Sequence, residues 1–84
     1  MSKRNDLFTI ARAEALFASR VPTGTRLDRT EATRAIHYAV RVHNGIRGCA
    51  AALAAAYGDY PDTAAPRMRW ARQVILSVYP REAS

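Results

Sequence analysis

The sequence predicts an all-α fold, a compact single-domain bundle of three to four helices. Its 84 residues are 49% hydrophobic and include only four glycines and four prolines, so few positions interrupt regular structure. In three long stretches, apolar residues recur every three or four positions, which is the period of an amphipathic helix. The length allows one domain with one small core. Residues 1–6 and 81–84 lie outside this pattern and are expected to be loose tails.

The first helix is predicted over residues 7–20, with Asn5 or Asp6 as its N-cap. The apolar stripe expected to be buried consists of Leu7, Ile10, Ala11, Phe17, Ala18 and Val21. Glu14 falls in the middle of this stripe, and Leu16 falls alone on the opposite, polar side. A buried carboxylate must be paired or protonated. Glu14 is therefore interpreted either as half of an ion pair with an arginine of another helix or as a specificity contact at a protein interface.

A loop is predicted over residues 21–27, because Pro22 and Gly24 interrupt the helical pattern. Asp28 and Glu31 then have the spacing of a capping box, which predicts the start of a second helix at about residue 29. This helix is expected to run to about residue 57. Its buried stripe is predicted to contain Ala35, Tyr38, Ala39, Val42, Ile46, Cys49 and Leu53.

Glycines in the centre of the second helix admit two interpretations. Asn44, Gly45 and Gly48 weaken the helical pattern, and two helical glycines cost about 2 kcal/mol relative to alanine. A break at Asn44-Gly45 would give four helices instead of three. Alternatively, Gly45, Gly48 and Ala52 form a ridge with almost no side-chain bulk. Another helix would then pack closely against this ridge, either within the fold or from a second copy of the chain.

A third helix is predicted to begin with Asp62 or Thr63 as its N-cap, with Pro66 inside its first turn and Pro80 ending it. Gly58 suits the position just past the end of the preceding helix. The stripe expected to be buried on this third helix consists of Met68, Ala71, Val74, Ile75 and Val78.

The charge favours a polyanionic partner. Thirteen Lys+Arg against seven Asp+Glu give a formal net charge of +6, and Lys3 is the only lysine. Arginine binds phosphate and carboxylate groups through two parallel hydrogen bonds and stacks on rings. We therefore expect a nucleic acid, a nucleoprotein complex or an acidic protein surface as the partner. The alternative is that the arginines only keep an alanine-rich surface soluble.

Basic faces on two of the predicted helices are the candidate binding sites. The candidate residues are Arg34, His37 and Arg41 on the second helix and Arg67, Arg69, Trp70 and Arg72 on the third. Arginines interleaved with a tryptophan suit phosphate contacts combined with ring stacking. The alternative for both helices is a solvated face, with Trp70 half-buried against the core.

No catalytic constellation is recognisable in the sequence, so we expect neither an enzyme nor a cofactor or metal site. His37 and His43 are six residues apart, which is not the spacing of zinc ligands on one helix. Cys49 lies on the apolar stripe and is interpreted as a small buried hydrophobe. No uncharged run approaches the roughly 20 residues of a membrane span, and no signal-peptide pattern is present. A cytoplasmic protein is expected.

The small size, the lack of an active site and the arginine faces at 34/41 and 67/69/72 resemble accessory proteins of phages and mobile elements. Within that group the chain is similar in type to anti-CRISPR proteins that act on type I surveillance complexes. Many anti-CRISPR proteins are acidic mimics of DNA, and the net charge of +6 departs from them. The resemblance therefore implies an inhibitor that covers an acidic or RNA-bearing surface and blocks engagement of target DNA.

Two other functions remain open. The segment 46–57 and the basic third helix resemble a helix-turn-helix, which would make the chain a small DNA-binding regulator. The small-residue ridge would instead make it a homodimeric helical adaptor. A monomer and a homodimer are both compatible with the sequence.

Overall fold

The computed structural model describes residues 3–80, with side chains from Leu7 onward. The helices are α1 (Lys3–Ala18), α2 (Arg29–Val42), α3 (Ile46–Asp59) and α4 (Pro61–Val78). Over the described residues the fold is all-α with four helices, as the sequence predicts. Asn5 and Asp6 lie inside α1, so the prediction that they cap it and belong to a loose tail is wrong. The other residues predicted as tails, 1–2 and 81–84, lie outside the described residues.

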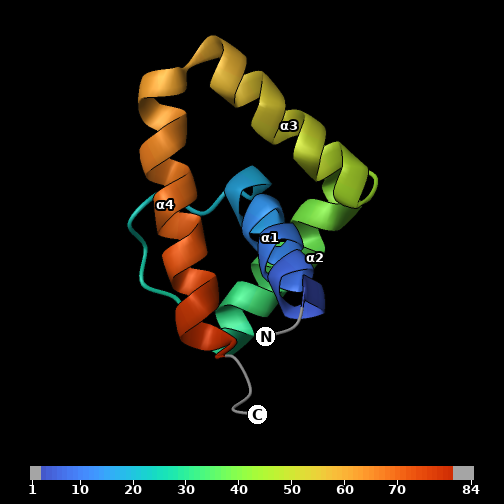
Figure 1. Cartoon of the computed structure of the whole chain (residues 1–84), viewed down its shortest axis with the longest axis vertical. Coiled ribbons are helices and arrows are strands. Elements are labelled where there is room, and N and C mark those ends of the chain that lie inside the picture. Colours follow the sequence, from blue (N-terminus) through green and yellow to red (C-terminus); the bar gives the residue numbers. More distant parts are fainter. Residues whose placement is uncertain (1–2, 81–84) are drawn as a thin grey trace.

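α1 occupies the centre of the bundle and contacts each of the other three helices, α4 most extensively. Figure 1 shows α4 beside α1, α2 crossing behind α1, and α3 running from the end of α2 to the start of α4. The Cα radius of gyration is 12.3 Å, close to the value of about 12 Å expected for a folded domain of this length. The loop at residues 19–28 leaves the end of α1 and runs beside α4 before α2 begins (Figure 1).

The capping box that starts α2 is confirmed. The backbone N–H of Glu31 donates to Oδ1 of Asp28 at 2.8 Å, and the backbone N–H of Asp28 donates to Oε1 of Glu31 at 2.9 Å. Two backbone donors that the helix itself cannot satisfy thereby find partners. The sequence therefore fixes the beginning of α2 through local contacts alone.

The second predicted helix is broken at Asn44-Gly45, so the prediction of one helix over residues 29–57 is wrong and its alternative is correct. Asn44 has φ 62° and Gly45 has φ 108°, and a helix cannot continue through two positive φ angles. A Cβ at position 45 would meet no atom within 4 Å. Gly45 is thus present for its backbone conformation, and the prediction that it packs closely against another helix is wrong.

Gly48 does make a close contact, but its neighbour is the turn that precedes α3. A Cβ at this position would overlap the backbone carbonyl oxygen of His43, the C-cap residue of α2. The missing side chain lets the first turn of α3 lie against the end of α2. Ala52, the third residue of the predicted ridge, is half-buried.

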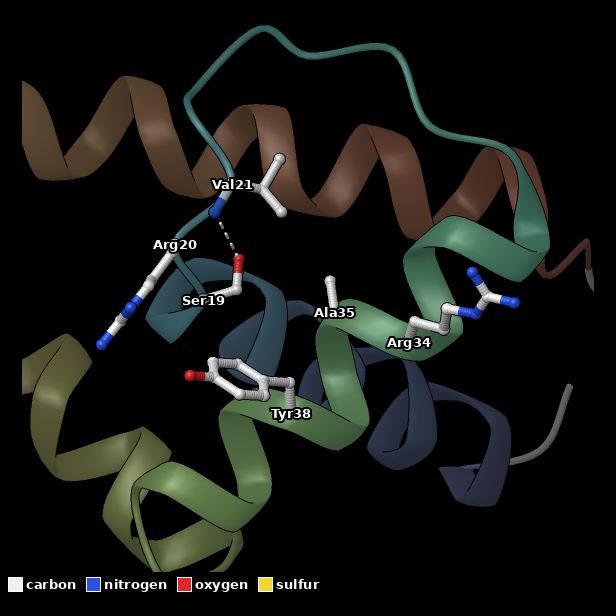
Figure 2. A pocket seen from close by; sticks show the side chains of 6 residues that line it. All are labelled: Ser19, Arg20, Val21, Arg34, Ala35 and Tyr38. Atoms are coloured by element: carbon white, nitrogen blue, oxygen red, sulfur yellow. Dashed lines mark hydrogen bonds between the residues drawn. The ribbon is translucent and has the colours of Figure 1, made fainter.

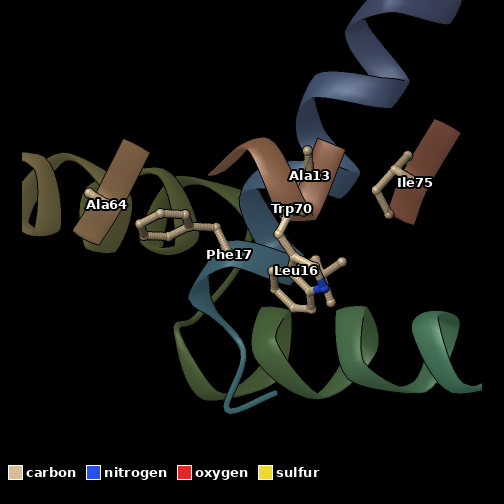
Figure 3. Packing of buried hydrophobic residues seen from close by; sticks show 7 residues of the cluster. Ala13, Leu16, Phe17, Ala64, Trp70 and Ile75 are labelled. Atoms are coloured by element: carbon tan, nitrogen blue, oxygen red, sulfur yellow. The ribbon is translucent and has the colours of Figure 1, made fainter. Parts of the chain in front are cut away.

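The main core lies between α1 and α4 (Figure 3). It consists of Ala13, Leu16, Phe17, Ala64, Trp70, Ala71 and Ile75. A second, smaller cluster of Ala15, Ala39 and Cys49 joins α1 to α2 and α3. Four of these ten residues are large, and the alanines between them let the helix axes approach closely.

The buried stripe predicted for α1 is only partly correct, because Phe17 is buried and Val21 packs against the core, but the N-terminal members of the stripe are exposed. Leu16 is fully buried, whereas Leu7 is 66% exposed and Ile10 is 49% exposed. The reason is the central position of α1, because its second half is enclosed by helices on several sides. Ala13, Ala15, Leu16 and Phe17 are all buried although they point in different directions around the helix. Burial in α1 thus changes along its length, and no single stripe describes it.

The stripes predicted for the later helices are partly correct. On α4, Ala71 and Ile75 are buried, and Met68 and Val74 pack against them. On α2 and α3, Ala39 and Cys49 are buried as expected. Tyr38, Val42 and Ile46 remain about half exposed, because the break at Asn44-Gly45 turns α3 out of line with α2.

Two predicted helix ends are displaced. Gly58 lies inside α3 and not beyond it, and α4 begins at Pro61 directly after Tyr60. Asp62 and Thr63 are therefore in the first turn of α4 and do not cap it. Pro61 at the first helical position is favourable, since its missing N–H would have no partner there. Pro66 lies beyond the first turn and removes one hydrogen bond of the helix.

The two helical glycines of α3 provide a matched stability test. We expect Gly48→Ala to lower the free energy of unfolding by about 1–3 kcal/mol, because the added methyl group displaces the His43 backbone. Gly58→Ala meets no atom within 4 Å and should raise the free energy of unfolding by up to about 1 kcal/mol through helix propensity. Urea denaturation measures both. A Gly48→Ala variant as stable as the wild type would show that the turn does not lie against α3.

Candidate functional site

Arg67 binds the C-terminal end of α1. Its Nε donates to the carbonyl oxygen of Phe17, and its Nη2 donates to that of Ser19, both at 2.9 Å. Its Nη1 donates to Oγ1 of Thr23 at 2.9 Å. The last carbonyls of a helix have no partner within the helix and carry partial negative charge, so a guanidinium suits this position. Arg67 is thus used within the fold, and its prediction as a partner-binding residue is wrong.

The guanidinium of Arg67 also lies between two aromatic rings. Its central carbon is 5.0 Å from the ring centroid of Trp70 and 5.6 Å from that of Phe17. Burial lowers the pKa of Arg67 from its ordinary value. The charge is compensated by the carbonyl oxygens and by the faces of the rings, which explains how an arginine is accommodated at the edge of an apolar core.

Trp70 is only 8% exposed, so it offers no ring surface to a base. Its Nε1 donates to the carbonyl oxygen of Thr25 at 3.0 Å. This bond and those of Arg67 attach the 19–28 loop to α4. The alternative interpretation, in which Trp70 packs against the core, is therefore correct.

His43 provides a further partner for the end of α1. Its Nε2 lies 3.1 Å from the carbonyl oxygen of Ala18. Ser19 binds the carbonyl oxygen of Leu16 through its backbone N–H at 3.1 Å and through its hydroxyl at 2.6 Å. Each carbonyl from residue 16 to residue 19 thus has a hydrogen-bond partner, and in three of the four cases the partner is the distant side chain of Arg67 or His43.

Cys49 is fully buried, as expected for a small hydrophobe. Burial raises the pKa of its thiol, and the negative charge of Glu14 raises it further. Glu14 itself lies in the second half of α1 and is half-exposed. Among the described residues it forms no hydrogen bond with an arginine, so the predicted ion pair with another helix is not present there.

Exposed basic side chains occur in the 19–28 loop and on α2, α3 and α4, and the predicted site residues among them lie on α2 and α4. Arg34, His37 and Arg41 are all exposed on one side of α2, and we call these three residues the α2 arginine face. No hydrogen bond or ion pair within residues 7–80 engages Arg34 or Arg41. Arg69 and Arg72 are exposed on α4, on the side of that helix that faces away from Ala71 and Ile75.

A groove adjoins the α2 arginine face (Figure 2). It is open to solvent, has a volume of about 350 Å³ and is lined by Ser19, Arg20, Val21, Arg34, Ala35 and Tyr38. The guanidinium carbon of Arg20 is 5.9 Å from the ring centroid of Tyr38. The segment directly after α1 and the middle of α2 thus bring two arginines and one aromatic ring to the same place.

Sequence reasoning missed Arg20 and Tyr38 as site residues. Tyr38 follows Arg34 by four positions and shares its side of α2, so helical periodicity could have revealed it. Its assignment to the buried stripe hid it. Arg20 comes from the end of α1, and no local pattern in the sequence indicates that it reaches α2.

No three metal-ligating side chains gather within the part of the chain that the structure describes. None of its helices combines the length and the hydropathy that crossing a lipid bilayer requires. A comparison with protein-family models, curated proteins and solved structures finds no match to this chain. The α2 arginine face and its groove are therefore the candidate functional site.

Removal of Arg67 tests its structural role. We expect Arg67→Ala to lower the free energy of unfolding by about 2–3 kcal/mol, because hydrogen bonds of a charged group to the end of α1 are lost. Arg69→Ala, two residues away and exposed, should change it by less than about 0.5 kcal/mol. Chemical denaturation of both variants gives the comparison. Equal stabilities for the two would contradict the structural role of Arg67.

Proposed function

We propose that the chain is a non-enzymatic binding protein that docks on a polyanion, a nucleic acid or a nucleoprotein complex, through the α2 arginine face. The observation that carries this proposal is that Arg34 and Arg41 are exposed and unengaged within residues 7–80, two helical turns apart on one side of α2. Arginine side chains in this state keep all their donors for phosphate oxygens.

The α2 face is favoured over α4. Two of the four candidates on α4, Arg67 and Trp70, are hydrogen-bonded within the fold. Arg69 and Arg72 remain exposed, and neither lies over an aromatic ring among the described residues. The α2 arginine face lies beside Tyr38 and beside the groove that this side chain lines.

The connection between α3 and α4 disfavours a helix-turn-helix regulator. A single residue, Tyr60, separates the two helices, whereas the motif uses a turn of about three or four residues. The first turn of α4 would have to contact bases, and it carries the acidic Asp62. Docking through α2 requires neither a longer turn between α3 and α4 nor a contact between the first turn of α4 and bases.

The resemblance to anti-CRISPR proteins makes a type I surveillance complex of a bacterial host the first partner to examine. In this form of the proposal the chain works in the cytoplasm and its α2 arginine face covers an RNA-bearing or acidic surface of the complex. Target DNA would then be excluded from that surface. An assay of target-DNA binding by such a complex, with and without the chain, examines this form directly.

Charge reversal at matched positions tests the proposed face. Arg34→Glu with Arg41→Glu and Arg69→Glu with Arg72→Glu each change the formal net charge by four, from +6 to +2. We expect the α2 pair to elute from immobilised heparin at a clearly lower salt concentration than the α4 pair, because location matters beyond net charge. The two double variants should have similar melting temperatures, since all four side chains are exposed.

Elution of the two double variants at the same salt concentration would show that only net charge matters. The α2 arginine face would then be a solvated helix surface without a binding role.

A further inference from the structure

We infer that the groove beside Tyr38 binds single-stranded nucleic acid, with one unpaired base on the Tyr38 ring and the flanking phosphates at Arg20 and Arg34. This inference rests on the proposed function and deepens it, because it names the polyanion and the place where it binds.

The groove has a charged side chain on each of two opposite sides and apolar side chains between them. Figure 2 shows Arg20 and Arg34 on opposite sides, with Tyr38 and Ala35 between them. Val21 adds a further apolar side chain. The volume of about 350 Å³ lies at the lower end of the range for small-ligand pockets, about 300–1,000 Å³. A flat, largely apolar group between two anionic groups is the complement of this lining.

A nucleotide within a strand has that composition, because each base lies between two phosphates. A single strand can place an unpaired base on an aromatic ring, and this stacking tolerates any sequence. A duplex keeps its bases stacked inside and offers only phosphates to the protein. The apolar part of the groove would gain nothing from a duplex, so the single strand is favoured.

A peptide C-terminus fits the groove less well, because it carries one carboxylate and the groove has arginines on both sides of its apolar part.

The remainder of the α2 arginine face would contact further phosphates of the same strand. His37 and Arg41 follow Arg34 by one and two helical turns and are exposed. Proteins that bind single strands align cations in this way along the phosphate backbone.

Fluorescence anisotropy with a labelled oligothymidylate of about twelve nucleotides tests the inference, a length within the site sizes of single-strand binders. We expect Tyr38→Leu to weaken binding about tenfold, as loss of one stacked base does. Tyr38→Phe, which keeps the ring, should bind within about twofold of the wild type. Tyr60→Leu is the matched control, since Tyr60 is 68% exposed and is not one of the residues that line the groove.

The oligonucleotide provides a second, independent comparison. An abasic strand of the same length should bind the wild type about tenfold more weakly than oligothymidylate, and it should show no further loss with Tyr38→Leu. A duplex should also bind the wild type more weakly than the single strand. The abasic strand separates stacking from charge, because it carries the same number of phosphates as the oligothymidylate.

Three results would overturn the inference. They are equal binding by Tyr38→Leu and Tyr60→Leu, equal binding of abasic and base-containing strands, and tighter binding of the duplex. If one of them occurs while heparin elution still depends on Arg34 and Arg41, the groove assignment fails and the proposed function stands. Loss of the heparin dependence as well would reject both. A labelled peptide with a phenylalanine between two aspartates that binds more tightly than the oligonucleotide would assign the groove to an acidic protein instead.

Discussion

The hydrogen bonds between Arg67 and the C-terminal end of α1 hold the architecture together. α1 is the central helix, and its last carbonyls lie where α4, the 19–28 loop and the end of α2 meet. An end of a helix that is withdrawn from water needs partners for these carbonyls. Arg67 from α4 and His43 from the end of α2 supply them. The placement of α2 and α4 around α1 is thus determined by polar contacts as well as by apolar burial.

Only some of the arginines take part in contacts that stabilise the fold. Arg67 lies within the fold, and Arg12 and Arg29 lie 4.1 and 4.9 Å from the ring centroid of Tyr79, where they help to join α1, α2 and the end of α4. Arg34 and Arg41 take no part in such contacts in the described chain. The high net charge therefore has two uses, because some arginines stabilise the fold and others, Arg34 and Arg41 among them, are available to a partner.

Much of the fold follows from local sequence signals, whereas the candidate site does not. The capping box of Asp28 and Glu31 and the weak point at Asn44-Gly45 depend on residues close in the chain, so the sequence shows them. The burial of Trp70 depends on a hydrogen bond to Thr25, 45 residues away, and the groove depends on Arg20 reaching α2. Such contacts arise only when the 19–28 loop folds beside α4, and no periodicity in the sequence encodes that. The stripe predicted on α1 is only partly correct for a related reason, since a central helix has no single solvent side.

The division of the arginines can be measured directly by NMR, through the Nε–Hε signals of the arginine side chains. In the free protein, the account predicts slow solvent exchange for Hε of Arg67, which is hydrogen-bonded to the end of α1, and fast exchange for Arg34 and Arg41. On addition of a single-stranded oligonucleotide, the signals of Arg34 and Arg41 should shift and that of Arg67 should remain in place. A shift of Arg67 with unchanged signals from Arg34 and Arg41 would contradict the account.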